Sequence, residues 1–219
     1  MSPTYNHYCP VARALEVVGD RWSLLIIRDL LRKPQRFTDL LHYSSNITPK
    51  RLTDTLRRLE EAGIVERESQ PSRREVWYRL TPVGRDFAPV VAALGAWGLR
   101  YAMRPPLPGE VVHPDLAIGT TASSLNRRSR KLAQPATWLI RFLPGGDYTL
   151  SFCDDRWSVH QGSEMSVDVT LTITPEAWAT FLAIEREKRG PMSQTMQIEG
   201  APERVKEFLN TFGVRDKDG

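Results

Sequence analysis

The stretch from Thr48 to Gly63 is the feature that most constrains the fold of this chain. Thr48 can cap a helix because its hydroxyl accepts a free amide of the first turn, and Pro49 suits the first helical position because it has no N–H to satisfy. Gly63 is typical of a helix end. Between these signals, an apolar stripe recurs at helical spacing, formed by Leu52, Leu56 and Leu59. The sequence therefore predicts a short capped helix with one buried face.

The outer side of this predicted helix is basic and rich in hydroxyl groups, with Lys50, Arg51, Thr53, Asp54, Thr55, Arg57 and Arg58. Upstream, a short amphipathic piece around Phe37, Leu40 and Leu41 leads into a Ser- and Asn-rich turn from His42 to Ile47. A helix, a turn and a capped basic helix in this order are typical of a helix-turn-helix, whose second helix enters the DNA major groove. The alternative is an ordinary surface helix whose charges only face solvent.

A predicted hairpin follows this helix and favours the DNA-binding interpretation. Val65 to Gln70 and Glu75 to Leu80 are expected to be strands, the second with alternating apolar and polar residues. The turn between them, Pro71 to Arg74, places Arg73 and Arg74 at its tip. A two-stranded wing with arginines would bring cations to the flanking DNA backbone or minor groove.

The charges of the chain are unevenly distributed. Met1 to Arg104 contains 17 Lys and Arg against 11 Asp and Glu, a net charge of +6, whereas Pro105 to Gly219 contains 13 against 15, a net charge of −2. A basic excess confined to one half indicates a polyanionic partner for that half. Because no stretch is apolar enough for a membrane span or a signal peptide, and the two cysteines, Cys9 and Cys153, form no disulfide framework, we expect a cytoplasmic protein.

Other helices are predicted around the helix-turn-helix. Pro10 to Val18 and Trp22 to Leu31 show helical patterns, and the second is apolar enough to be the core helix of the domain. Lys33 to Arg36 is expected to be a turn, and Thr81-Pro82 opens a helix that runs to Tyr101. Because this last helix has a wide apolar face outside the compact winged unit, it needs a partner.

The order of short motifs in this half resembles the HxlR-type family of bacterial winged-helix transcriptional regulators. The motifs are Tyr8-Cys9-Pro10, Gly19-Asp20-Arg21-Trp22, Arg36-Phe37, Ile47-Thr48-Pro49-Lys50, Leu59-Glu60-Glu61-Ala62-Gly63 and Tyr78-Arg79-Leu80-Thr81-Pro82-Val83-Gly84. The resemblance implies a homodimer whose first and last domain helices pack across a two-fold axis and which binds a palindromic operator. The short wing turn Pro71-Ser72-Arg73-Arg74, without a second proline, departs from the family pattern.

Two kinds of candidate site follow for this half. The predicted DNA contacts, with base edges assigned to the start of the helix and phosphates to its later arginines, are Arg36, Thr48, Pro49, Lys50, Arg51, Thr53, Asp54, Arg57, Arg58, Arg73 and Arg74. In relatives of this family, a cysteine near the amino terminus can sense oxidants or electrophiles, and Cys9 matches that position. The alternative is a buried, structural Cys9.

The second half begins with a linker. Arg104 to His113 is rich in proline and contains Gly109, which is typical of a stiff, extended segment. Pro114 to Lys131 is predicted to be a helix that ends in a basic cluster, Arg127, Arg128, Arg130 and Lys131. The cluster could contact DNA, or it could be a solvated helix end. After Pro135, period-two patterns predict strands around Trp138 to Phe142, Tyr148 to Phe152, Arg156 to Gln161 and Val167 to Ile173. A helix from Thr174, a last strand from Gln194 to Glu199 and a closing helix complete the pattern.

This order of strands and helices, from Trp138 to Val214, resembles a sterol carrier protein-like domain. The expected fold is thus α+β, with a winged helix-turn-helix domain over residues 1–104, a linker over 105–113, and over 114–219 an antiparallel-rich sheet with helices on one face. The resemblance implies that an apolar small molecule binds between sheet and helices, where large side chains would line the site: Trp138, Phe142, Tyr148, Phe152, Trp157, Trp178, Phe181, Met192 and Met196.

Three functions for this second domain remain open on the sequence alone: an effector-binding domain, a purely structural support for a regulator that senses through Cys9, and an enzyme. The last is not expected, because the histidines, His7, His42, His113 and His160, lack metal-ligand spacing and because there is no Gly-rich phosphate loop or nucleophile elbow. No cofactor or metal is predicted.

Overall fold

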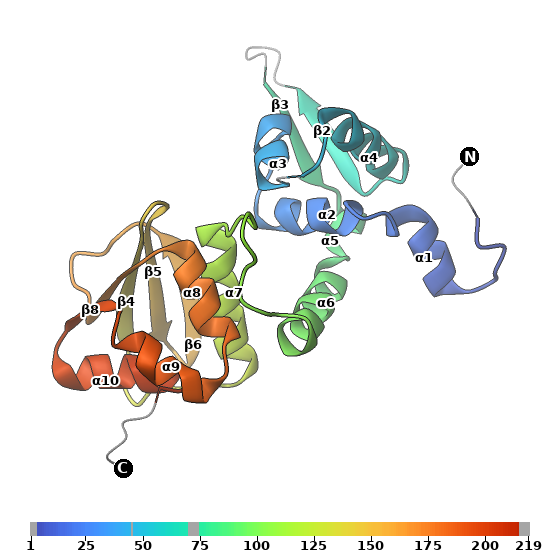
Figure 1. Cartoon of the computed structure of the whole chain (residues 1–219). Coiled ribbons are helices and arrows are strands. Elements are labelled where there is room, and N and C mark those ends of the chain that lie inside the picture. Colours follow the sequence, from blue (N-terminus) through green and yellow to red (C-terminus); the bar gives the residue numbers. More distant parts are fainter. Residues whose placement is uncertain (1–3, 45, 70–74, 215–219) are drawn as a thin grey trace. The chain divides into compact units, whose positions relative to one another are not determined.

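The computed structural model describes residues 4–44, 46–69 and 75–214 (Figure 1). The chain divides into two compact units between Tyr101 and Ala102. No helix in the described ranges is long and apolar enough to cross a lipid bilayer.

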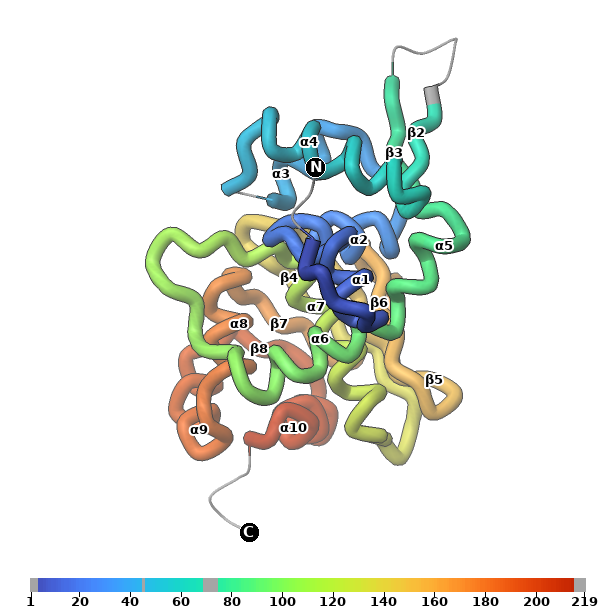
Figure 2. The backbone as a smooth tube through the Cα atoms, turned by 90° about the vertical axis from the view of Figure 1, so that its right-hand side faces the viewer, coloured from blue at the N-terminus to red at the C-terminus, as the bar shows by residue number. Residues whose placement is uncertain are grey.

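The first unit is a winged helix-turn-helix, as the sequence predicts. Its elements are α1 (Pro10–Val18), α2 (Ser23–Arg32), β1 (Gln35–Arg36), α3 (Phe37–Tyr43), α4 (Pro49–Glu61), β2 (Val65–Ser69), β3 (Val76–Leu80), α5 (Pro82–Arg85) and α6 (Ala88–Tyr101). The strands form one antiparallel sheet in the order β1-β3-β2. The β2–β3 hairpin directly follows α4 in the chain (Figure 2).

Local sequence determines where α4 begins and ends. The Thr48 hydroxyl accepts a hydrogen bond from the Arg51 amide at 3.2 Å, Pro49 occupies the first helical turn, and Gly63 takes a left-handed φ of +68°. The predicted leucine stripe is buried, and it packs in the core of the unit with Ile26 and Ile27 of α2. Full burial of a leucine contributes roughly 1.5–3 kcal/mol, so this stripe fixes which side of α4 faces outward.

Two predictions for the first unit are wrong in detail. The expected turn at Lys33 to Arg36 contains β1, because Gln35 and Arg36 pair with Tyr78 and Trp77 of β3. The expected helix from Pro82 to Tyr101 is two helices, α5 and α6. Pro89 explains the break, since it has no N–H to donate to the carbonyl four residues earlier and its ring would collide with that carbonyl.

The second unit is a mixed α+β layer structure. Its elements are α7 (Pro114–Arg127), β4 (Ala136–Phe142), β5 (Gly146–Cys153), β6 (Arg156–Gln161), β7 (Val169–Ile173), α8 (Pro175–Ala183), α9 (Arg186–Ser193), β8 (Gln197–Gly200) and α10 (Pro202–Thr211). The sheet order is β6-β5-β4-β7-β8, with β4 and β7 parallel and the other pairs antiparallel. Side chains of α7, α8 and α10 share one hydrophobic core with the strands of this sheet.

Three details of the second unit differ from the sequence predictions. The helix predicted to reach Lys131 ends at Arg127, and Ser129 then takes a left-handed φ of +49°. Helix α9 is not predicted, because Gly190 and Pro191 inside it hide a helical pattern. The linker does not run extended.

A clasp within the linker accounts for its shape. Arg104 and Glu110 form a bidentate ion pair with N–O distances of 2.8 and 2.6 Å, and the Glu110 amide donates to the Leu107 carbonyl at 3.0 Å. The Arg104 guanidinium and the Leu107 amide together lower the pKa of Glu110 to about 2. The carboxylate is therefore charged, and the clasp can persist, throughout the neutral pH range.

Candidate DNA-binding interface

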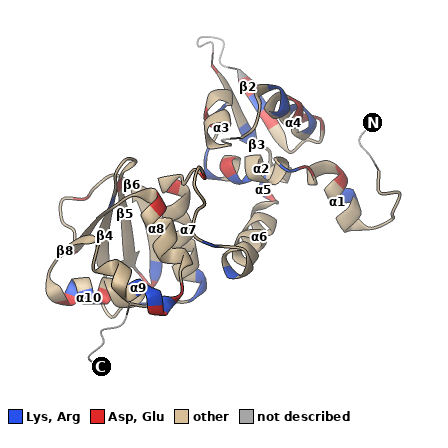
Figure 3. Cartoon of the chain, in the orientation of Figure 1, with Lys and Arg blue, Asp and Glu red and all other residues tan. Residues whose placement is uncertain are grey.

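The outward side of α4 carries a group of exposed polar side chains. Lys50, Thr53, Asp54 and Arg57 are all exposed, while the leucine stripe on the opposite side is buried. Figure 3 shows Lys and Arg recurring along α4, interspersed with acidic residues. Two of these side chains have partners within the helix: the Thr53 hydroxyl donates to the Pro49 carbonyl at 2.9 Å, and Arg57 pairs with Glu61 at 2.9 Å. Lys50 at the start of α4 is thus well placed for an external anionic partner.

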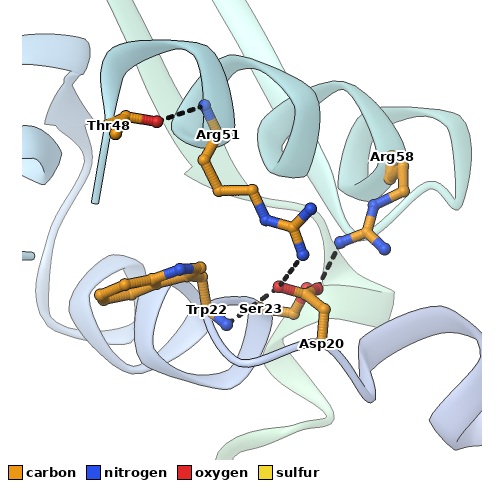
Figure 4. Close-up of polar contacts among 6 residues, drawn as sticks. All are labelled: Asp20, Trp22, Ser23, Thr48, Arg51 and Arg58. Carbon is orange, nitrogen blue, oxygen red and sulfur yellow. Dashed lines mark hydrogen bonds and ion pairs between the residues drawn. The ribbon is translucent and has the colours of Figure 1, made fainter. Parts of the chain in front are cut away.

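A carboxylate outside α4 contacts two of its arginines (Figure 4). Asp20 lies between α1 and α2, and its Oδ2 accepts from the Ser23 hydroxyl and pairs with Nη2 of Arg58. Its Oδ1 accepts from the Trp22 amide at 2.9 Å and lies 4.0 Å from Nη2 of Arg51. Burial alone would raise the pKa of Asp20, but the hydrogen bonds from Ser23, Trp22 and Arg58 outweigh it and keep the pKa below the usual value.

Arg36 and Arg58 were both predicted to contact DNA, and the structure gives both carboxylate partners inside the protein. Arg36 occupies the N-cap position of α3, where its amide donates to the Asp39 carboxylate at 3.1 Å. Its guanidinium pairs with Asp39 and Glu75 at 3.4 Å each and lies over the Trp77 ring at 5.6 Å. A cation that already has an acid partner has less charge to offer phosphates. Lys50 has no acid partner in the described part of the chain, and Arg51 approaches Asp20 only at 4.0 Å. These two are therefore the stronger candidates for DNA contacts.

The wing offers cations on its described strands. The predicted tip residues Arg73 and Arg74 lie outside the described residues. Arg79 of β3 pairs with Glu66 at 3.0 Å and with Glu68 at 3.5 Å. Arg67 of β2 is exposed and has no carboxylate partner in the described part of the chain. The sequence predicts wing cations only at the tip, so Arg67 is not among the predicted DNA contacts.

Asp20 is the other residue that sequence reasoning missed. It belongs to the motif Gly19-Asp20-Arg21-Trp22, which is part of the family resemblance but does not by itself indicate a role for Asp20. The only signal was a single acid placed directly before an apolar core helix. Its partner Arg58 lies 38 residues further along the chain, a separation that helical periodicity cannot bridge.

Two helices of the first unit present apolar side chains to solvent. Every residue of α6 is at least partly exposed, and one side of it carries Val90, Leu94, Trp97 and Tyr101, with Trp97 60% exposed. On α1, Val11 and Leu15 are also exposed. Exposed apolar faces of this kind mark interaction surfaces.

The predicted sensor cysteine lies at the start of α1. Cys9 is half-buried and occupies the N-cap position, where its side chain makes no capping hydrogen bond to the described residues. Cys153, in the second unit, is exposed. Cys9 is thus neither sealed in a core nor fully open to solvent.

The nine residues predicted to line an apolar pocket lie together in the core of the second unit. All the aromatic ones are buried, and Met192 and Met196 pack against them half-buried. The rings contact one another, with centroids 5.0 Å apart for Trp138 and Trp157 and 5.8 Å for Trp178 and Phe181. Among the described residues, neither Nε1 of Trp138 nor that of Trp178 has a hydrogen-bond partner.

A separate open pocket of about 350 Å³ lies on the surface of the second unit. None of the nine predicted pocket residues lines it. Its lining is mostly polar or charged and consists of Arg130, Lys131, Leu132, Ala133, Glu203, Lys206, Glu207, Asn210 and Thr211. Arg130 donates to the Asn210 carbonyl at 2.8 Å, and Lys131 pairs with Asp155. These two members of the basic cluster after α7 are thus engaged within the unit.

Comparison with known sequences gives a family for the first unit. The family model described as HxlR-like helix-turn-helix matches residues 17–105. The uncharacterized HTH-type transcriptional regulator Rv3095 of Mycobacterium tuberculosis is 42% identical over 98 residues, which are 43% of this chain and 60% of that protein. The chain thus spans less than two thirds of the length of this relative.

Two further proteins are similar over a comparable share of the chain. The uncharacterized HTH-type transcriptional regulator YdeP of Bacillus subtilis is 33% identical over 97 residues, covering 44% of this chain and 76% of that protein. Among solved structures, the redox regulator HypR in its oxidized form is 35% identical, covering 41% of this chain and 94% of its own, with a TM-score of 0.40. By its sequence and its winged unit, the chain belongs to the HxlR-like helix-turn-helix family.

Proposed function

We propose that this protein is a DNA-binding transcriptional regulator that recognises a palindromic operator as a homodimer. The observation that carries the proposal is the structure of α4. This helix is capped, its orientation is fixed by a buried leucine stripe, and it exposes Lys50, Thr53 and Asp54 at its start. In a helix-turn-helix, the residues at the start of the second helix contact base edges in the major groove.

The exposed groups of α4 suit two kinds of contact. Arg51 and Lys50 can donate to guanine, and Asp54 can accept from cytosine. Arg57 lies further along the helix and would contact phosphates if DNA displaced it from Glu61. Arg67 on the wing would add a phosphate contact beside α4. Residues at the start of α4 would therefore determine the DNA sequence specificity, and the other cations would determine the affinity and its salt dependence.

The homodimer is supported by the apolar sides of α1 and α6. A second copy of the chain would cover Leu94, Trp97 and Tyr101, which a single chain leaves in water. A two-fold symmetric dimer contacts two half-sites, and these would lie about one helical turn of DNA, roughly 34 Å, apart.

Selection of bound fragments from random and genomic DNA by the full-length protein tests this proposal. We expect a palindrome with half-sites about 10 base pairs apart, centre to centre. The variant Lys50→Ala/Arg51→Ala, with both changes at the exposed start of α4, should lose the selected sequence and remain folded. Absence of any enriched sequence with the wild-type protein would contradict the proposal.

For the second unit, we propose a sterol carrier protein-like domain that binds an apolar small molecule and thereby alters DNA binding. Support comes from the order of β7, α8, β8 and α10 around an aromatic core, and from two indole N–H groups in that core that have no hydrogen-bond partner among the described residues. A buried donor without an acceptor is costly, and a ligand with an acceptor group would relieve that cost. Regulation further requires that the ligand bind the two functional states with different affinity.

Native mass spectrometry and thermal melts with a panel of lipids and aromatic compounds test this second proposal. We expect retained ligand or a raised melting temperature. If neither is found, a purely structural second unit becomes the better explanation, because the aromatic rings already contact one another within the core.

A further inference from the structure

We propose that Asp20 is a positioning residue for sequence recognition: its carboxylate tethers α4 through Arg58 and orients Arg51 for contact with a base. The inference rests on the proposed DNA-binding function. It adds a residue outside the recognition helix, with no DNA contact of its own, as a determinant of the operator sequence.

The spacing of the two arginines along α4 makes this arrangement possible. Arg51 and Arg58 are seven residues apart, so they lie on nearly the same side of the helix, two turns and about 10 Å apart along its axis. Asp20 lies between their guanidinium groups, and Figure 4 shows it reaching both. One fixed carboxylate therefore contacts α4 at two levels, as a direct ion pair at Arg58 and at 4.0 Å at Arg51.

The carboxylate itself is held rigidly from its own side. The Trp22 amide and the Ser23 hydroxyl, both at the start of α2, donate to its two oxygens. Its side chain is only 9% exposed, and the half-buried Arg58 is 35% exposed. A largely buried carboxylate with fixed donors cannot follow a moving arginine, so the arginines must conform to it.

The two arginines are held to different degrees. Arg58 forms a direct ion pair with Oδ2, which uses its charge inside the protein and makes it a tether rather than a phosphate contact. Arg51 is 51% exposed, and only its Nη2 approaches Asp20, at 4.0 Å. Its Nε and Nη1 remain available to donate to a base, and the partial restraint by Asp20 reduces the side-chain entropy lost on binding.

The negative charge of Asp20 should also affect how well the protein distinguishes operator from random DNA. With Asp20 in place, the positive charges of Arg51 and Arg58 are partly neutralised when DNA is absent. Removal of the carboxylate would release both arginines to any phosphate, which strengthens binding to random DNA while the base contact becomes less defined. Asp20 therefore favours the operator over other DNA in both respects.

The test compares Asp20→Asn with Glu61→Gln in the full-length protein. Both variants remove one negative charge next to an α4 arginine, since Glu61 pairs with Arg57, but Glu61 does not contact Arg51. Operator DNA is first selected with the wild-type protein, and affinities for operator and random DNA are then measured at several salt concentrations. We expect Asp20→Asn to lower the operator-to-random ratio about tenfold, with lost preference at one base position per half-site, and Glu61→Gln to leave that preference intact.

A double-mutant cycle separates positioning from general stability. If Asp20 acts through Arg51, Asp20→Asn should cause little further loss of base preference in an Arg51→Ala background. If Asp20→Asn does not fold, Asp20→Glu keeps the charge but moves the carboxylate, and should lower the ratio with an unchanged salt slope. The inference is overturned if the folded variant selects the wild-type sequence, or if Asp20→Asn and Glu61→Gln change base preference equally. If the wild-type protein itself selects no sequence, it is the proposed function that fails.

Discussion

Replacement of Trp97 by alanine should weaken the proposed homodimer about 100-fold. Trp97 lies on the outer side of α6 and is 60% exposed in the single chain. A large aromatic side chain buries about 150–250 Å² when it is fully covered, so a partner would remove roughly 90–150 Å² of each Trp97 from water. At about 25 cal/mol per Å², this contributes ~3 kcal/mol for each copy.

The expected effect on the dimer follows from these values. Two copies contribute ~6 kcal/mol at most, and alanine retains part of the contact, so we expect a loss of about 3 kcal/mol in dimerisation free energy. That loss corresponds to an increase of about 100-fold in the dimer Kd. Sedimentation velocity over a dilution series measures this Kd directly.

A matched control is available within the same unit. Val83 on α5 is also 60% exposed but lies outside the apolar side of α6, so Val83→Ala should leave the dimer Kd unchanged. A Trp97→Ala protein with the wild-type Kd, or a wild-type protein that is monomeric at every concentration, would refute the argument that the exposed side of α6 is covered by a second copy.

Four other predictions concern single residues of the first unit. Arg51→Ala should weaken operator binding far more than binding to random DNA in a titration of both; equal losses would make Arg51 a phosphate contact only. Thr48→Ala should lower the free energy of unfolding by about 1 kcal/mol in a denaturant titration, because the Arg51 amide loses its cap; an unchanged value would mean that water replaces the hydroxyl. Because the pKa of Asp20 is lowered by folding, its contribution to stability should be present above about pH 4 and be lost below it, and Asp20→Asn should flatten the acid side of a stability-versus-pH curve. If Cys9 senses oxidants, Cys9→Ser should abolish oxidant-dependent release of DNA; unchanged release would assign Cys9 a structural role.

Local signals account for the parts of the fold that the sequence predicts well. The cap at Thr48, the leucine stripe and the glycine at position 63 all act within a few residues of one another, and they define α4 closely. The strands of the second unit are also predicted well by a local signal, their period-two pattern, because alternate residues face one core. Where a signal is absent or misleading, as for α9 with its Gly190 and Pro191, the prediction fails.

The candidate site is less predictable because its electrostatics depend on distant residues. Arg36 and Arg58 look like free cations in the sequence, but Glu75 and Asp20, 39 and 38 residues away, pair with them in the fold. The aromatic residues of the second unit pose a related problem. Their types fit the walls of a pocket or a filled core equally well, and only the ring-to-ring distances show that they pack against one another.

The Arg104–Glu110 clasp determines how the connecting segment can act as a tether. An extended chain of seven residues spans more than about 20 Å, and proline would keep such a chain stiff. The clasp folds this length into a closed loop, so most of its contour adds nothing to the reach of the segment. Opening the loop, for example by Glu110→Gln, would lengthen the tether without changing the number of residues in it. The segment thus holds extra length in reserve, closed by one ion pair and the hydrogen bonds between Leu107 and Glu110.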